Sequence, residues 1–173
     1  MLKILAFIIE LLICICVLWV TAFLSTLVHE LGHALAYLLA TRDRQWHIRV
    51  GSGKKLLETK MLTVKLLVFD GYFAPAENRI DSKGKLIAML LGGPIASLIL
   101  VIVLALLKFG GISWESEILA TGSIEFFLDF ALFCNAYLFV FSVLPVHYLF
   151  GEIRGMATDG LQILNAIKHK EKP

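Results

Sequence analysis

The sequence has 173 residues, which is enough for one domain, and 58% of them are hydrophobic while only 17% are charged. Soluble globular chains average about 45–50% apolar and about 25% charged residues, so this composition indicates lipid, rather than water, as the main solvent. The net charge of +2, with no basic stripe interleaved with aromatic residues, argues against a nucleic-acid partner. The lipid bilayer is the partner that composition predicts.

The first predicted span covers residues 4–40 and is interrupted only by Glu10 and by the polar cluster His29, Glu30 and His33. A membrane helix needs about 20 mostly apolar residues, so this longer run predicts a helix that tilts or protrudes. Its apolar core exceeds the usual length of about 7–15 residues in a signal peptide, and no A-x-A cleavage site follows it. We therefore expect it to remain as an anchor.

A polar connection over residues 41–85 follows the first span. Residues 46–50 and 62–69 have β-type patterns, and Gly51, Gly53 and Gly71 punctuate them. This connection is therefore expected to hold a small membrane-associated β-hairpin.

Two further spans are predicted over residues 86–107 and 124–144, the latter stopped by Pro145. A short amphipathic helix is expected over residues 159–168, with Lys168, Lys170 and Lys172 suited to an anionic leaflet. The predicted fold is thus an all-α membrane protein with about three transmembrane helices, in which residues 1–173 form a single membrane-embedded domain.

The distribution of basic residues predicts the orientation. Ten Lys or Arg residues lie in the 41–85 connection and four follow Pro145, whereas the opposite side has only Lys3 and Lys108, beside Glu115 and Glu117. The positive-inside rule then places the N-terminus outside and the C-terminus in the cytoplasm. The expected location is a bacterial cell membrane.

The motif His29-Glu30-Leu31-Gly32-His33 lies inside the first predicted helix. Four residues correspond to about 400° of rotation, so both imidazoles project from one face and can reach a single zinc ion. Zinc lowers the pKa of a bound water, and Glu30 can take the remaining proton and deliver it to a leaving amine. An ionisable residue near the centre of a span costs at least ~2.5 kcal/mol by insertion scales, which favours a functional cluster over a coincidence.

Zinc needs a third protein ligand, and Asp159 in Thr158-Asp159-Gly160 is one candidate. It precedes a helix-like segment, so its ordinary role would be that of a helix N-cap. Asn135, within the third span, must find a polar partner, either on a neighbouring helix or in a substrate.

The motifs, in their order along the chain, resemble the site-2 protease family of intramembrane metalloproteases. They are the His29–His33 motif in the first span, Gly92-Gly93-Pro94 in the second, and Pro145 followed by Asp159-Gly160 after the third. Asp70-Gly71-Tyr72-Phe73 lies where that family has a membrane-dipping β element that ends in a turn.

The resemblance implies one zinc ion per chain, held by His29, His33 and Asp159, with Glu30 as general base and acid. It also implies cleavage of transmembrane or membrane-anchored polypeptides. An extended substrate would pair with the β element, and Gly71 is the expected point of contact.

Three features depart from the family pattern. Ser97 and Ser142 stand where the family commonly has Asn, and Pro145 and Asp159 are fourteen residues apart. His147 and Glu152, inside this expanded segment, therefore remain alternative third ligands. The predicted function is a zinc-dependent intramembrane endopeptidase, and the alternative is a non-catalytic membrane scaffold or zinc-binding homologue.

Overall fold

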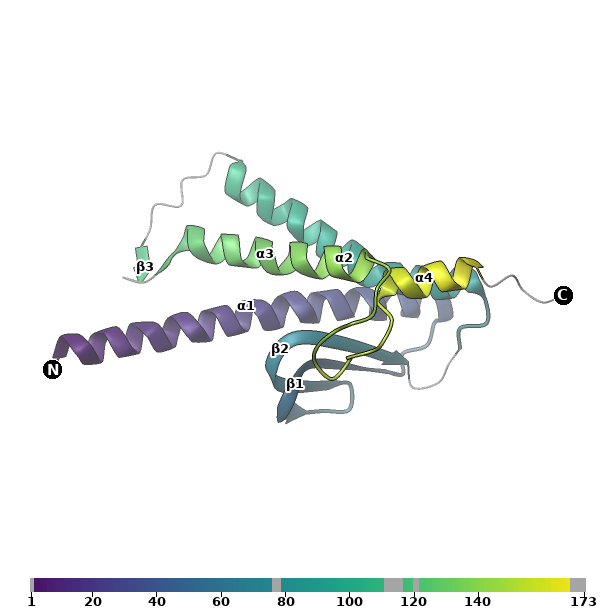
Figure 1. Ribbon diagram of the computed structural model, residues 1–173, viewed down its shortest axis with the longest axis horizontal. Coiled ribbons are helices and arrows are strands. Elements are labelled where there is room, and N and C mark those ends of the chain that lie inside the picture. Colours follow the sequence, from purple (N-terminus) through teal and green to yellow (C-terminus); the bar gives the residue numbers. More distant parts are fainter. Residues whose placement is uncertain (1, 76–78, 111–116, 120–121, 169–173) are drawn as a thin grey trace.

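The computed structural model describes residues 2–75, 79–110, 117–119 and 122–168. Its elements, in chain order, are α1 (Leu2–Thr41), β1 (Trp46–Glu58), β2 (Leu62–Pro75), α2 (Lys83–Phe109), β3 (Glu117–Leu119), β4 (Gly122–Ser123), α3 (Ile124–Val143) and α4 (Asp159–Lys168). The three long helices lie alongside one another, and the β1–β2 hairpin lies against the C-terminal half of α1 (Figure 1).

Helices α1, α2 and α3 are each long and apolar enough to cross a membrane, as the three apolar runs predict. The helices α1 and α2 extend beyond the expected bounds of 4–40 and 86–107, while α3 ends at Val143, one residue before the expected end. Pro94 lies inside α2, and the missing N–H of a proline is tolerated in a membrane helix when neighbouring helices compensate. The short β3–β4 pair was not predicted.

The hairpin is confirmed between α1 and α2, but its strands are longer than the predicted 46–50 and 62–69. Ile48, Arg49 and Val50 have Cα partners in both parts of β2, because the register shifts repeatedly. The start of β1 therefore lies between residues 62–64 and residues 71–73, and the end of β2 forms an outer edge. Gly71 lies on this edge, opposite Val50, and not in the turn that the sequence indicated.

Strand β2 runs along α1. Trp19 Nε1 donates to the Leu66 carbonyl at 2.7 Å, and Thr26 Oγ1 donates to the Val68 carbonyl at 3.2 Å. Farther along the helix, the rings of Tyr37 and Phe73 lie 5.7 Å apart. This alignment brings the outer edge of β2 to the level of the HExxH motif.

Helices α1 and α2 approach most closely at two glycines. A Cβ added to Gly32 would lie 2.3 Å from the Gly92 carbonyl oxygen, and one added to Gly92 would lie 2.3 Å from the Gly32 carbonyl oxygen. Only glycine permits such an approach between backbones. The contact is one residue away from His33 on one helix and from Gly93 on the other.

A loop over residues 144–158, here called the strap, joins α3 to α4. It leaves the end of α3, passes beside the hairpin and returns to α4 (Figure 1). Helix α4 has the bounds expected for the amphipathic helix, 159–168; Lys170 and Lys172, like Glu115, lie outside the described residues.

Candidate metal centre

Helix α1 places both histidines of the motif on one buried face. His29 is 4% exposed and His33 is 5% exposed, and their ring centroids are 5.0 Å apart. One turn of helix separates them, as the i, i+4 spacing predicts. Both Nε2 atoms therefore point into the same small volume.

Asp159 completes the group from the other end of the fold. Its Oδ2 lies 3.7 Å from His29 Nε2 and 3.4 Å from His33 Nε2. Ligands bound at about 2.1 Å to a tetrahedral zinc ion are about 3.4 Å apart, so these separations match such a site. Among the residues that the structure describes, no other group of His, Cys, Asp or Glu is placed to hold a metal.

The Asp159 Oδ2 atom is buried and has no hydrogen-bond partner. A buried carboxylate oxygen is normally paired or bound to a metal. Burial alone would raise the pKa of the Asp159 carboxyl, but its contacts with the two imidazoles outweigh burial and lower the pKa to about 2. The group is therefore ionised at neutral pH, which is the form that binds a cation.

The outer nitrogens of both imidazoles have polar partners on α2. His33 Nδ1 lies 2.8 Å from the Met89 carbonyl oxygen, and His29 Nδ1 lies 2.8 Å from Ser97 Oγ. A carbonyl only accepts, so His33 Nδ1 carries a proton, which leaves Nε2 as the ring nitrogen that can bind a metal. Such partners fix the tautomer and ring orientation of metal-binding histidines.

Ser97 stands where the site-2 protease pattern commonly has asparagine. The structure places its fully buried hydroxyl against His29. Ser142, the other serine at such a position, donates to the Phe139 carbonyl at 3.0 Å within its own helix.

Glu30 lies on the side of α1 that faces the hairpin. It is buried, and a Cβ added to Gly71 would lie only 2.2 Å from Glu30 Oε1. The absence of a side chain at Gly71 therefore leaves room for the carboxylate. Glu30 and the outer edge of β2 are in direct contact, although 41 positions separate Glu30 from Gly71 in the sequence.

Gly93 is similarly close to the two ligands on α1. A Cβ at this position would lie 2.2 Å from His33 Nε2 and 2.6 Å from His29 Nε2. Gly93 therefore borders the space in which a metal ion would sit. In the Gly92-Gly93-Pro94 segment, Gly92 permits the close approach of α1 and α2, and Gly93 leaves room beside the two imidazoles.

Thr158 holds Asp159 in place. Its hydroxyl donates to the Leu144 carbonyl at 2.5 Å and accepts from the Leu161 amide at 3.3 Å. The N-cap role that the sequence allowed for Asp159 is thus filled by Thr158, and the Asp159 side chain is free to turn toward the histidines. A Cβ at Gly160 would lie 1.9 Å from the Val143 carbonyl oxygen, so glycine permits α4 to start close against the end of α3.

The two alternative third ligands lie elsewhere. His147 is exposed and forms an isolated backbone bridge with Ala157. Glu152 accepts hydrogen bonds from Arg49 and Lys65 of the hairpin. Neither side chain belongs to the group formed by His29, His33 and Asp159.

Asn135 connects two helices. It is 2% exposed, and its Nδ2 donates to Ser25 Oγ at 3.0 Å and to the Ala131 carbonyl at 2.8 Å. These bonds fit the interhelical role that the sequence analysis considered beside substrate contact. Its Oδ1 is buried and unpaired.

Neither a family model nor a curated protein matches this sequence. The chemistry therefore has to be argued from the arrangement itself: two imidazoles, a carboxylate that faces them, and a second carboxylate beside an open strand edge.

Proposed function

We propose that this chain is a zinc-dependent intramembrane endopeptidase that hydrolyses peptide bonds of transmembrane or membrane-anchored polypeptides. The observation that carries the proposal is the convergence of His29, His33 and Asp159, whose ligand atoms all lie within 4.8 Å of one another. The unpaired Asp159 Oδ2 and the adjacent Glu30 give this group a ligand set and a base.

His29, His33 and Asp159 would hold one zinc ion per chain. When bound, zinc supplies a Lewis acid that lowers the pKa of water and polarises a carbonyl group. Ser97 and the Met89 carbonyl orient the two imidazoles through their Nδ1 atoms. Three protein ligands leave a fourth position open, which is the pattern of a catalytic rather than a structural zinc site.

Glu30 is assigned the proton transfers. Its carboxylate accepts a proton from the attacking water and delivers it to the nitrogen of the cleaved amide, which leaves as an amine. Its direct contact with Gly71 and its position next to His29 in the sequence support this role. A scissile bond held at that edge would be within reach of it.

Residues 71–75 are proposed as the surface that binds substrate. A transmembrane helix keeps its amides in internal hydrogen bonds, so a substrate must unwind before an amide can be attacked. Addition of the unwound segment to an open strand edge replaces those bonds. Gly71 is the residue where such a segment would meet Glu30.

The proposal includes membership in the site-2 protease family and insertion of α1, α2 and α3 into a membrane. The motif order supports the former, and the length and hydropathy of the helices support the latter. With the ten basic residues of the 41–85 connection on the cytoplasmic side, hydrolysis would take place near the cytoplasmic leaflet.

Metal analysis of the purified protein, combined with cleavage of a panel of single-span peptides in proteoliposomes, tests the proposal. We expect about one zinc per chain and cleavage that stops when a chelator removes the metal. Absence of zinc from the purified, folded protein would overturn the ligand assignment. Stoichiometric zinc without cleavage of any peptide would favour a zinc-binding scaffold instead.

A further inference from the structure

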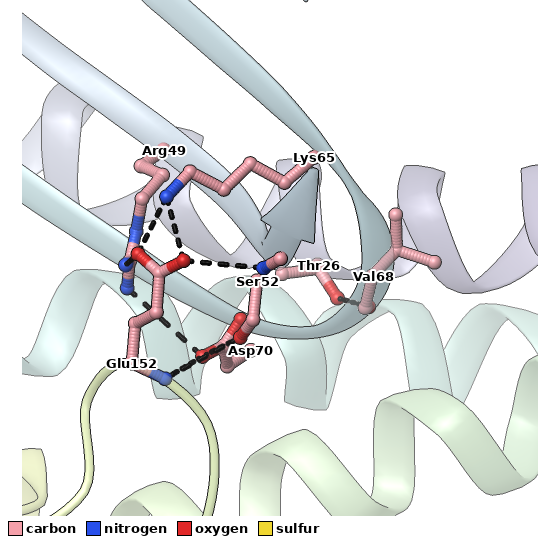
Figure 2. A network of polar contacts seen from close by, with 8 residues as sticks. Thr26, Arg49, Ser52, Lys65, Val68, Asp70 and Glu152 are labelled. Atoms are coloured by element: carbon pink, nitrogen blue, oxygen red, sulfur yellow. Dashed lines mark hydrogen bonds and ion pairs between the residues drawn. The ribbon is translucent and has the colours of Figure 1, made fainter. Parts of the chain in front are cut away.

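A second polar cluster joins the strap to the hairpin. The Glu152 carboxylate accepts from Arg49 Nη1 at 2.5 Å, from Lys65 Nζ at 2.5 and 2.7 Å, and from the Gly53 amide at 3.1 Å (Figure 2). The donors belong to β1 and β2, while the carboxylate comes from the loop after α3. The hairpin therefore carries a preformed set of donors for one carboxylate.

The two cations are much less exposed than the carboxylate. The side chain of Arg49 is 16% exposed and that of Lys65 is 17% exposed, against 38% for Glu152. Gly53 adopts a φ of +80°, a conformation that favours glycine and in which its amide donates to the same carboxylate. The donors are thus parts of the hairpin itself, with both cations half-buried, whereas Glu152 belongs to the strap and is more exposed.

Glu152 makes the hydrogen bonds between the strap and the hairpin. In the described part of the chain, every hydrogen bond between strap and hairpin is made by Glu152, through its side chain or through its amide, which donates to Asp70 Oδ2 at 3.1 Å. At the tip, Leu149 is 70% exposed and Phe150 is 83% exposed. The strap's hydrogen bonds to the hairpin are therefore concentrated at Glu152, next to the buried side chain of Ile153, while the tip of the strap is exposed.

Gly151 allows the strap to sit this close. Its φ is +76°, and a Cβ at this position would lie 2.3 Å from Asp70 Oδ2. A side chain at position 151 would therefore separate the strap from the hairpin while leaving all the donors unchanged.

The cluster is electrically neutral only while Glu152 is present. Arg49 and Lys65 carry two positive charges, and Asp70 and Glu152 carry two negative ones. Withdrawal of Glu152 would leave one excess positive charge, and the Arg49, Lys65 and Gly53 donors would lose the carboxylate that accepts their hydrogen bonds. A low-exposure cation without a partner is strongly unfavourable, so the donors would bind another carboxylate.

The cluster lies next to the proposed substrate edge. Asp70 immediately precedes Gly71, which contacts Glu30, and Arg49 pairs with Tyr72 across the sheet. Neighbouring residues on a strand are about 3.3 Å apart. A polypeptide bound along residues 71–75 could therefore place a carboxylate within reach of Arg49 and Lys65.

We propose that Arg49, Lys65 and the Gly53 amide form a carboxylate-binding subsite for the substrate, which Glu152 occupies when no substrate is bound. The ligand is an acidic side chain or a chain-terminal carboxylate, and the inference rests on the proposed function for its identification as substrate. Substrate binding would displace the strap.

Binding of labelled single-span peptides to the full chain tests this subsite, with Glu30→Gln as the background so that nothing is cleaved. One probe carries Glu beside the span and has an amidated C-terminus, and its twin carries Gln. A third probe carries Gln and a free C-terminal carboxylate at the same place, so that the two sources of the carboxylate are distinguished. Fluorescence anisotropy in nanodiscs gives each dissociation constant.

In Glu152→Gln, the carboxylate probe should bind about tenfold more tightly than its neutral twin, because its charge-assisted hydrogen bonds replace those that the strap makes in the unaltered protein. Gly151→Ala, which moves the strap without altering the donors, should produce the same preference. Lys65→Gln in the Glu152→Gln background should abolish it, whereas Lys54→Gln, the same change of charge at an exposed position, should retain it.

Equal binding of the three probes in both Glu152→Gln and Gly151→Ala would overturn the subsite. Equal losses from Lys65→Gln and Lys54→Gln would do the same, because they would indicate general attraction to positive charge. A carboxylate preference in a protein that cleaves no peptide would sustain the subsite and count against the proposed function alone.

Discussion

The first half of α1 (residues 2–21) and the second half (residues 22–41) are both largely apolar, but the first half is mostly exposed and the second half is packed against other elements. Of the nine buried residues in this helix, Cys14 alone precedes Ala22. In the first half, large apolar side chains such as Phe7, Ile9 and Leu12 are about half exposed. In the second half the buried residues include Thr26, His29, Glu30 and His33, and the hairpin, α2 and α3 surround them.

The difference shows what a polar residue in a span requires. Four buried polar side chains in the second half have partners on other elements: Ser25 bonds to Asn135, Thr26 to Val68, His29 to Ser97, and His33 to Met89. In the first half, Cys14 is the one buried residue, and apart from the bond of Trp19 to Leu66 its exposed apolar side chains suit contact with lipid tails. Substitutions should therefore act strongly in the second half and weakly in the first.

The largest effect is expected from Glu30→Gln. The amide cannot transfer the proton, while both imidazoles remain in place, so cleavage should fall about 10²–10⁴-fold with zinc content unchanged. Peptide turnover and metal analysis of the same preparation measure both quantities. Turnover equal to wild type in this variant would remove Glu30 from the mechanism.

Asp159→Ala should reduce both zinc content and cleavage, because it removes the one carboxylate that faces the two histidines. His147→Ala is the matched control, since His147 lies outside this group and should retain most of both. Full zinc occupancy in Asp159→Ala together with metal loss in His147→Ala would exchange the roles of the two residues.

Gly32→Ala should destabilise the fold by about 1–3 kcal/mol, as overpacking typically does, because the new Cβ would meet the Gly92 carbonyl at 2.3 Å. Gly84→Ala is the control: the same change at a helical position with no atom within 4 Å. Thermal unfolding in detergent measures the difference. Equal stability of the two variants would contradict the close contact between α1 and α2.

A smaller effect is expected from pH on the strap. Hydrogen bonding to Lys65, with support from the Gly53 amide and Arg49, lowers the pKa of Glu152 from 4.5 to about 2. A lowered pKa in the docked state means that docking is fully stabilised above pH 4.5 and weakens as the pH falls toward 2. The other charged groups that face Glu152 in the cluster are Arg49, Lys65 and Asp70.

A fluorophore on Leu149→Cys, in a protein whose native cysteines are replaced, should report release of the strap over this window. Glu152→Gln should remove that part of the response. An identical pH profile with and without Glu152 would show that Glu152 does not control release of the strap.

The smallest effect is expected from Ile9→Val in the first half of α1. This side chain is 48% exposed and faces outward, so stability and cleavage should both change little, within about 0.5 kcal/mol for stability. A large loss of activity would show that the first half of α1 has a partner of its own.

The three long helices, Leu2–Thr41, Lys83–Phe109 and Ile124–Val143, were predictable because long apolar runs have few alternatives to helix. The placement of the two histidines on one face was predictable, because residues four positions apart lie about one turn apart on a helix. The exact form of the hairpin was not, since the repeated register shifts between β1 and β2 depend on packing against α1.

The remaining parts of the site depend on contacts between distant residues. Ser97 is 68 positions from His29, and Glu152 is 103 positions from Arg49, and no local spacing relates such pairs. Asp159 was one candidate ligand from the sequence and was favoured over His147 and Glu152 through the family resemblance, and the capping role of Thr158 was missed. A threonine directly before the helix was the available signal, because Thr is a preferred N-cap residue.

The separation of the ligands along the chain has a consequence for biosynthesis. His29 and Asp159 are 130 positions apart, and a chain grows from its N-terminus. If the proposed function holds, the first helix enters the membrane with its histidines and Glu30 before the strand edge, the orienting groups on α2 and Asp159 have been synthesised. The nascent chain would then be unable to hydrolyse its neighbours at the translocon, and the proposed activity would begin only when translation has passed Asp159 and α4 has packed against the end of α3.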